Sequence, residues 1–291
     1  MHGQDRRRRG HVPSAFALAA SLALVAVGLT ACEDEEPDAP DNAFDYVAIG
    51  DSFTATGLPE APNDCKRSTQ NYPHLIAEAN PDFVLVDVSC GGASTSDMLE
   101  SQEFRGTVQP PQFDALTEGT DLVTVSLGGN DFGVYWGFLY RCTQVAFEDP
   151  DGDPCRVTNN GRIEQQMGKI RDNLAEVLEE VGEKSPDARV MFVGYPRLLP
   201  DEGTCPDRVP VATGDVDYVR EMLALLVDAQ KGAAEDAGAE YVDVYTPSQG
   251  HDICSDDPWV NDATDGPEGS YNFHPMPAHQ RAVADLILEM L

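Results

Sequence analysis

The sequence predicts an α/β fold, a three-layer α/β/α sandwich with a central five-stranded parallel sheet. Five short runs rich in β-branched and aromatic residues are typical of buried parallel strands, and they span residues 44–49, 83–88, 122–127, 189–193 and 241–244. Apolar residues recur three and four positions apart, as on one face of a helix, within 163–181, 216–226 and 282–290. Strands that alternate with helices favour right-handed crossovers, which cover a parallel sheet with helices.

The first 31 residues have the pattern of an export signal. Arg6, Arg7, Arg8 and Arg9 precede an uncharged apolar stretch from residue 12 to residue 31, so that a positive end is followed by a membrane-seeking segment. The stretch ends in Leu29-Thr30-Ala31-Cys32, which resembles the bacterial lipoprotein signal. We therefore expect a signal peptide over 1–31 and lipidation of Cys32, with an ordinary secretory signal or an uncleaved anchor as the alternatives. Each of these predicts an extracellular domain, either secreted or held at the cell surface.

The charge of the chain is strongly acidic. Nineteen Lys and Arg residues face 51 Asp and Glu residues, a formal net charge of −32 among 291 residues. Residues 1–31 hold four of the basic and one of the acidic residues, so the remainder has 15 against 50. Such a surface repels phosphate backbones and anionic headgroups. We expect a monomer with no nucleic-acid partner, which contacts a membrane only through a lipid anchor at Cys32. Residues 32–43, with six acids among 33–41, predict a solvated tether.

The cysteines point to the same compartment. Without Cys32, six remain, at positions 65, 90, 142, 155, 205 and 254. An even number in an exported chain predicts three disulfides, and about 15 pairings are open. No CxxC pair occurs, which argues against a zinc cluster. An EF-hand-like run at 149–153 has Pro154 and Asn160 where a calcium loop needs glycine and glutamate, so we expect no metal.

Three polar motifs follow the first three predicted strands, where ligands bind in such sheets. They are Gly50-Asp51-Ser52, Cys90-Gly91-Gly92 and Gly128-Gly129-Asn130-Asp131. A serine that attacks esters needs a base, and His274 is the first candidate because Pro275 stiffens its turn before the last predicted helix. His279 is a weaker candidate.

Together these motifs resemble the SGNH (GDSL) hydrolase family over about residues 44–291. Ser52, Gly92, Asn130 and His274 stand in the order of its four blocks. The cysteines and the chain start are most similar to actinobacterial secreted lipases and esterases of the family. The resemblance implies a flavodoxin-like fold, no cofactor, and the disulfides Cys65 to Cys90, Cys142 to Cys155 and Cys205 to Cys254.

The resemblance also implies the chemistry. Ser52 attacks a small-molecule or lipid acyl ester and forms an acyl-enzyme, with His274 as the base. The backbone amides of Ser52 and Gly92 and the side chain of Asn130 form the oxyanion hole. The alternatives are a carbohydrate O-deacetylase of the same family, or a binding lipoprotein that keeps only the scaffold.

One position departs from the family pattern. Many relatives carry an aspartate three residues before the histidine, where this chain has Tyr271. We hypothesise that the Tyr271 main-chain carbonyl accepts the His274 Nδ1–H. A carboxylate remains the alternative, from Asp252, Asp256, Asp257, Asp262 or Asp265.

Residues 132–160 predict a loop insertion. Its aromatic side chains either line an acyl pocket or pack under a disulfide loop, and they belong to Tyr135, Trp136, Phe138 and Tyr140.

Overall fold

The computed structural model describes residues 43–56, 65–264 and 271–291. Its central sheet has five parallel strands in the order β2-β1-β5-β6-β7. They are β1 (Phe44–Gly50), β2 (Phe83–Asp87), β5 (Leu122–Ser126), β6 (Arg189–Val193) and β7 (Glu240–Val242). The order is that of a flavodoxin-like sheet, and the predicted fold class is confirmed.

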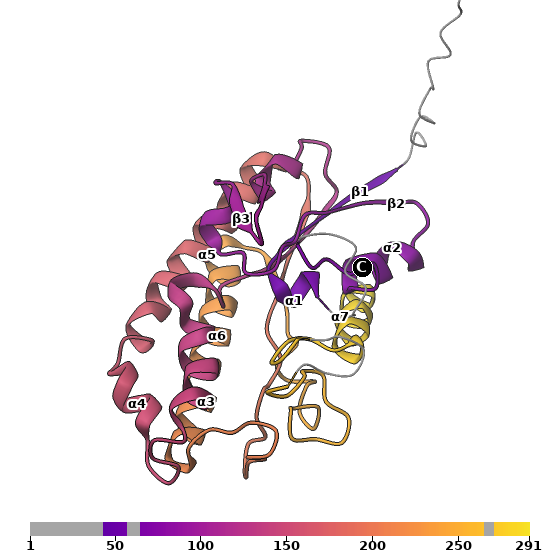
Figure 1. The fold of residues 1–291 in the computed structure, drawn as a ribbon. Coiled ribbons are helices and arrows are strands. Elements are labelled where there is room, and N and C mark those ends of the chain that lie inside the picture. The colour runs from indigo at the N-terminus through magenta and orange to yellow at the C-terminus, as the bar shows by residue number, and fades with distance from the viewer. Residues whose placement is uncertain (1–42, 57–64, 265–270) are drawn as a thin grey trace, which may run out of the picture. The chain divides into compact units, whose positions relative to one another are not determined.

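Helices cover both faces of the sheet (Figure 1). One layer holds α5 (Glu164–Lys184) and α6 (Val216–Ala237), and the other holds α2 (Tyr72–Ala79) and α7 (Pro277–Met290). Side chains of β1 alternate between two apolar cores, because neighbouring residues in a strand point to opposite faces. Val47 and Ile49 join the core that contains the α5 and α6 stripes, whereas Tyr46 and Ala48 join the core that contains α2 and α7.

The strand register brings three chain segments to one edge. Parallel pairing places Ala48 beside Asp87, and Gly50 beside Ser126. The amide of Asp51 then donates to the Ser126 carbonyl at 3.1 Å. The motifs that follow β1, β2 and β5 therefore meet at the carboxyl edge of the sheet, where the sequence predicted a site.

The remaining elements are short. They are α1 (Ser52–Ala55), α3 (Arg141–Val145), α4 (Pro154–Asn159), a hairpin of β3 (Gln102–Phe104) and β4 (Thr107–Gln109), 3₁₀ turns at Thr95–Met98, Gln112–Ala115, Asp131–Gly133 and Thr213–Asp215, and a π-helical turn at Trp136–Tyr140. The prediction of a loop over 132–160 is wrong, because much of this segment is helical. Phe138 is buried in the core and the Cys142–Cys155 disulfide joins the segment's helical parts, whereas its Gly, Pro and Asp residues obscured the helical spacing.

Three disulfides stabilise the connections: Cys65–Cys90, Cys142–Cys155 and Cys205–Cys254. These are the pairs that the resemblance implied. The signal peptide, Cys32 and all of the tether except Ala43 lie outside the described residues. In the part of the chain that the structure describes, no helix is both long and apolar enough to cross a bilayer.

Candidate active site

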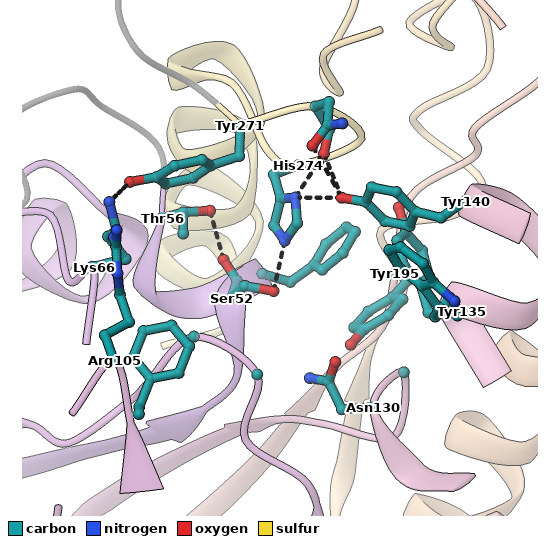
Figure 2. A pocket seen from close by; sticks show the side chains of 17 residues that line it. Ser52, Thr56, Lys66, Arg105, Asn130, Tyr135, Tyr140, Tyr195, Tyr271 and His274 are labelled. Carbon is teal, nitrogen blue, oxygen red and sulfur yellow. Dashed lines mark hydrogen bonds between the residues drawn. The ribbon is translucent and has the colours of Figure 1, made fainter. Parts of the chain in front are cut away.

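Ser52 lies at the first position of α1, directly after the turn that ends β1. Asp51 is the N-cap, and its carboxylate accepts the amide of Phe53 at 2.8 Å. The first amides of a helix have no acceptor within the helix, so the Ser52 N–H is free to face a ligand. The Ser52 hydroxyl oxygen lies 2.9 Å from His274 Nε2 (Figure 2). The sheet edge thus brings together two residues that are 222 positions apart.

The His274 ring is oriented by the turn that carries it. Its Nδ1 lies 2.8 Å from the main-chain carbonyl of Asn272 and 3.4 Å from the Tyr140 hydroxyl, which also donates to that carbonyl at 2.7 Å. A carbonyl can only accept, so the Nδ1 atom carries the hydrogen and Nε2 is left to accept from Ser52.

The predicted acceptor, the Tyr271 carbonyl, is wrong. It accepts the His274 backbone amide at 3.2 Å and the Asn261 side chain at 3.3 Å. Phe273 has a left-handed φ of 56°, and this tight turn presents the carbonyl of Asn272 to the ring instead.

The other acid and base candidates lie elsewhere. Among the described residues no aspartate bonds the His274 ring: Asp252 accepts the Cys254 amide, Asp262 accepts from Thr264, and Asp257 lies beside His251. Asp256 makes no hydrogen bond to the His274 ring in the described structure, and Asp265 lies outside the described residues. His279 is buried behind the site, with its ring edge-on to Phe53 and Trp259.

Two further motifs contribute possible donors. Gly92 has a φ of 75°, a backbone conformation that glycine adopts without steric cost. The Asn130 amide nitrogen donates to the Ala93 carbonyl at 2.9 Å, which orients the side chain and leaves its second hydrogen for a ligand. Ser52, Gly92 and Asn130 line one cavity of about 500 Å³, together with His274.

A buried carboxyl links two of the motifs from below. Asp51 accepts a hydrogen bond from the Tyr195 hydroxyl, and Tyr195 packs directly under Gly129. A Cβ added to Gly129 would lie 2.7 Å from the Tyr195 oxygen, so only glycine fits there. Burial raises the pKa of Asp51 to about 7, although the hydrogen bonds from Tyr195 and Phe53 lower it.

The cavity has two kinds of wall (Figure 2). Tyr135, Tyr140 and Tyr195 lie on one side of Ser52, and Trp136 stacks on Tyr140 with 4.8 Å between ring centroids. Phe138 instead packs in the core near the Cys142–Cys155 disulfide, so the members of the aromatic cluster divide between the cavity wall and the core. The sequence did not single out Lys66, Arg105 or Tyr195, which also line the cavity.

Comparison with known proteins decides the family. The GDSL-like Lipase/Acylhydrolase family matches residues 48–282. The chain belongs to this family. It is 39% identical to Lipase 2 of Streptomyces coelicolor over 247 aligned residues, and the alignment covers 82% of each chain. As a GDSL-family member it is a lipase or esterase, that is, a carboxylic ester hydrolase.

Solved structures agree with that assignment. The GDSL-family chain is similar to phospholipase A1 from Streptomyces albidoflavus NA297, with a TM-score of 0.69 and 29% identity over 86% of this chain and 100% of that one. It is also similar to the extracellular lipase from Streptomyces rimosus, with a TM-score of 0.70 and 26% identity over the same shares.

The buried His279 predicts acid sensitivity of the fold. Neither of its ring nitrogens has a hydrogen-bond partner in the described structure, and burial lowers its pKa to about 3. Below about pH 6.5 the unfolded chain binds a proton at this histidine that the folded chain does not, so stability falls by up to about 1.4 kcal/mol per pH unit.

Between about pH 6.5 and 4.5, we expect the free energy of unfolding of His279→Leu to fall by about 2 kcal/mol less than that of the wild type. Urea unfolding at both pH values measures the difference. Asp51, whose raised pKa acts in the opposite sense, is common to both proteins and cancels. Equal losses in the two proteins would contradict the prediction.

Proposed function

We propose that this GDSL-family enzyme hydrolyses acyl esters through a Ser52–His274 dyad. The observation that carries the proposal is the 2.9 Å contact between Ser52 Oγ and His274 Nε2, with Nδ1 held by the Asn272 carbonyl. Oγ attacks the ester carbonyl while Nε2 takes its proton, and the proton then passes to the leaving alcohol. Water, activated in the same way, releases the acid from the acyl-Ser52 intermediate.

The negative charge that develops on the carbonyl oxygen needs fixed donors. The backbone amides of Ser52 and Gly92 and the side-chain amide of Asn130 are proposed for this role, since all three residues line the cavity. Donors held in place before the reaction stabilise the transition state without reorganisation. That four motif residues share one cavity favours an enzyme over a binding protein that keeps only the scaffold.

The substrates proposed are lipid esters or short-chain acyl esters. The aromatic wall offers an apolar surface to an acyl chain. Two relatives are named as a lipase and a phospholipase A1, which supports a lipid ester as the substrate of this chain.

We also propose that the domain works outside the cell as a monomer. Disulfides persist in oxidising compartments, and the structure has three. Residues 1–31 would direct export, Cys32 would carry the lipid and residues 32–43 would be the tether. Mass spectrometry of the mature N-terminus tests the export proposal: a lipid on Cys32 would support the anchor, an unmodified terminus after residue 31 would leave secretion, and a chain that keeps residues 1–31 would leave an uncleaved anchor.

The pH dependence of activity follows from the His274 environment. Burial lowers the pKa of His274 below 6.5, and its hydrogen bond to the Asn272 carbonyl raises it only in part. A protonated ring cannot accept from Ser52, so we expect kcat/KM to fall on the acid side with a midpoint below pH 6.5. Profiles of kcat/KM for a neutral ester over about pH 4 to 8 measure this.

Asp51 is the control for that profile, because its pKa of about 7 lies close by. Asp51→Asn keeps one oxygen as the acceptor for the Phe53 amide and offers an NH₂ group to the Tyr195 hydroxyl, which can accept instead of donate, and it removes the titration. The acid limb should persist in this variant. A midpoint at or above 6.5 in Asp51→Asn would contradict the assignment to His274.

The proposal is tested with a chromogenic acyl ester series and an organophosphate inhibitor. The protein should hydrolyse the esters, and the organophosphate should abolish that activity. The inactivated protein should carry one diethylphosphoryl group per chain, on the peptide that contains Ser52. Ser52→Ala should take up no label. Absence of hydrolysis from acetyl to palmitoyl esters, or a label on another residue, would overturn the proposal.

A further inference from the structure

We infer that the cavity selects esters whose alcohol part carries an anionic group, a phosphodiester or a carboxylate, bound by Lys66 and Arg105. The inference rests on the proposed function and names the substrate class of the same site. The charges that line the cavity are opposite in sign to the net charge of the molecule.

The chain beyond residue 31 has 15 basic residues against 50 acidic ones. The cavity nevertheless has two cationic side chains, Lys66 and Arg105, and no aspartate or glutamate among its described lining residues. A strongly acidic surface repels anions at long range. Local cations beside Ser52 therefore provide the attraction that an anionic substrate needs to reach the site.

Lys66 is held in place by its neighbours. Lys66 has a left-handed φ of 63° and directly follows Cys65. Cys65 is tied to the Gly91–Gly92 turn by its disulfide to Cys90 and by its carbonyl, which accepts the Gly91 amide at 2.9 Å. Its ammonium donates to the Tyr271 hydroxyl and lies 4.4 Å from the centroid of that ring. Tyrosine is a neutral partner, and no carboxylate of the described chain pairs with this lysine, so its charge is left for a ligand.

Arg105 lies at the tip of the β3–β4 hairpin. Its φ of 54° and the Gly106 φ of 86° are those of a tight hairpin turn that favours Asn-Gly. Arginine at the first of these positions is conformationally costly, and such residues cluster at functional sites. Within the described residues no acid pairs with its guanidinium. The hairpin is attached to the same turn as Lys66, because the Gln102 side chain donates to the Gly91 carbonyl at 2.9 Å.

The two kinds of side chain lie on opposite sides of Ser52 (Figure 2). Lys66 and Arg105 are on one side, and Tyr135, Tyr140 and Tyr195 are on the other. An ester bound at Ser52 extends both ways from its carbonyl carbon. An apolar acyl chain fits the aromatic side, so the alcohol part, with its anionic group, fits the cationic side.

Matched pairs of esters test the inference on the mature protein. The carboxylate pair is 4-butyryloxybenzoate and the neutral 4-butyryloxybenzamide. The phosphodiester pair is monomeric dihexanoyl phosphatidylglycerol and dihexanoylglycerol. The readout is the ratio of kcat/KM for the anionic ester to that for the neutral one, in which the amount of folded enzyme cancels. We expect wild type to prefer the anionic member of at least one pair by about tenfold.

Lys66→Gln and Arg105→Gln should each lower the ratio about fivefold, which is the effect of losing one partly exposed ion pair. Lys66→Arg should restore most of it. Lys231→Gln removes the same charge from α6, outside the cavity, and should leave the ratio within about twofold.

A preference confined to the phosphodiester pair identifies a phospholipid-type substrate, and one confined to the carboxylate pair identifies a carboxylate ester. Hydrolysis of the neutral esters with a ratio that neither glutamine variant changes would overturn the inference alone. Failure to hydrolyse any of the four esters, together with the chromogenic series, would overturn the proposed function.

Discussion

Replacing Ser52 with alanine should lower kcat for acyl-ester hydrolysis by about 10⁴-fold or more. The methyl group cannot attack, so the acyl-enzyme route closes, and only catalysis by the oxyanion donors and by binding remains. His274→Ala should cost a similar factor, because Nε2 accepts the Ser52 proton at 2.9 Å and no other described base lies within reach. The double variant should lose little more than either single one, since the two residues act as a unit.

Initial rates with a butyryl ester, on protein purified by the same procedure, measure these losses. Ser96→Ala is the matched control, because Ser96 is exposed and lies outside the cavity. It should keep wild-type activity, which would show that neither a serine replacement as such nor the purification causes the loss. Losses that multiply in the double variant would show that Ser52 and His274 act separately.

Replacing Asn130 with alanine should lower kcat by about 10² to 10³-fold, with a much smaller effect on KM. The Asn130 amide is already oriented by the Ala93 carbonyl at 2.9 Å. As a proposed oxyanion donor, it would stabilise the transition state without an entropic cost at the moment of reaction. Asn130→Asp should be at least as damaging, because a carboxylate repels the oxyanion.

Asn173→Ala is the control for the Asn130 variants. The Asn173 amide reaches Thr95 Oγ1 at 3.4 Å in the network that also holds Asp131, but Asn173 does not line the cavity. It should change kcat less than about threefold. A loss below about tenfold in Asn130→Ala, or one that falls mainly on KM, would remove Asn130 from the oxyanion hole.

The layers of the fold could be predicted because the buried side chains of a helix recur in the sequence with the period of the helix, and buried strands read as short apolar runs. The stripe over 163–181 lies in α5 and its N-cap Ile163, and all five predicted strands are present. The segment over 132–160 could not be predicted in the same way. Its short helical turns depend on burial of Phe138 and on the Cys142–Cys155 bridge, which are tertiary contacts without a local pattern.

The site was predictable where motifs follow strands. Ser52, Gly92 and Asn130 meet because parallel strands end at one edge, and His274 reaches them from the segment before α7. The partner of His274 was not predictable, because a left-handed Phe273 decides which carbonyl faces the ring. Lys66 and Arg105 likewise come to the cavity through one disulfide and one hairpin turn.

The order of the disulfides has a consequence for how the chain is made. Each bridge joins two described cysteines that follow one another along the sequence, and no bridge encloses another. A chain that is oxidised while it is still being exported, N-terminus first, meets the native partner of each thiol before any other. Cys32 is the exception, since as a free thiol it would precede Cys65. Acylation of Cys32 would remove that competitor and leave an order of emergence that needs no isomerase.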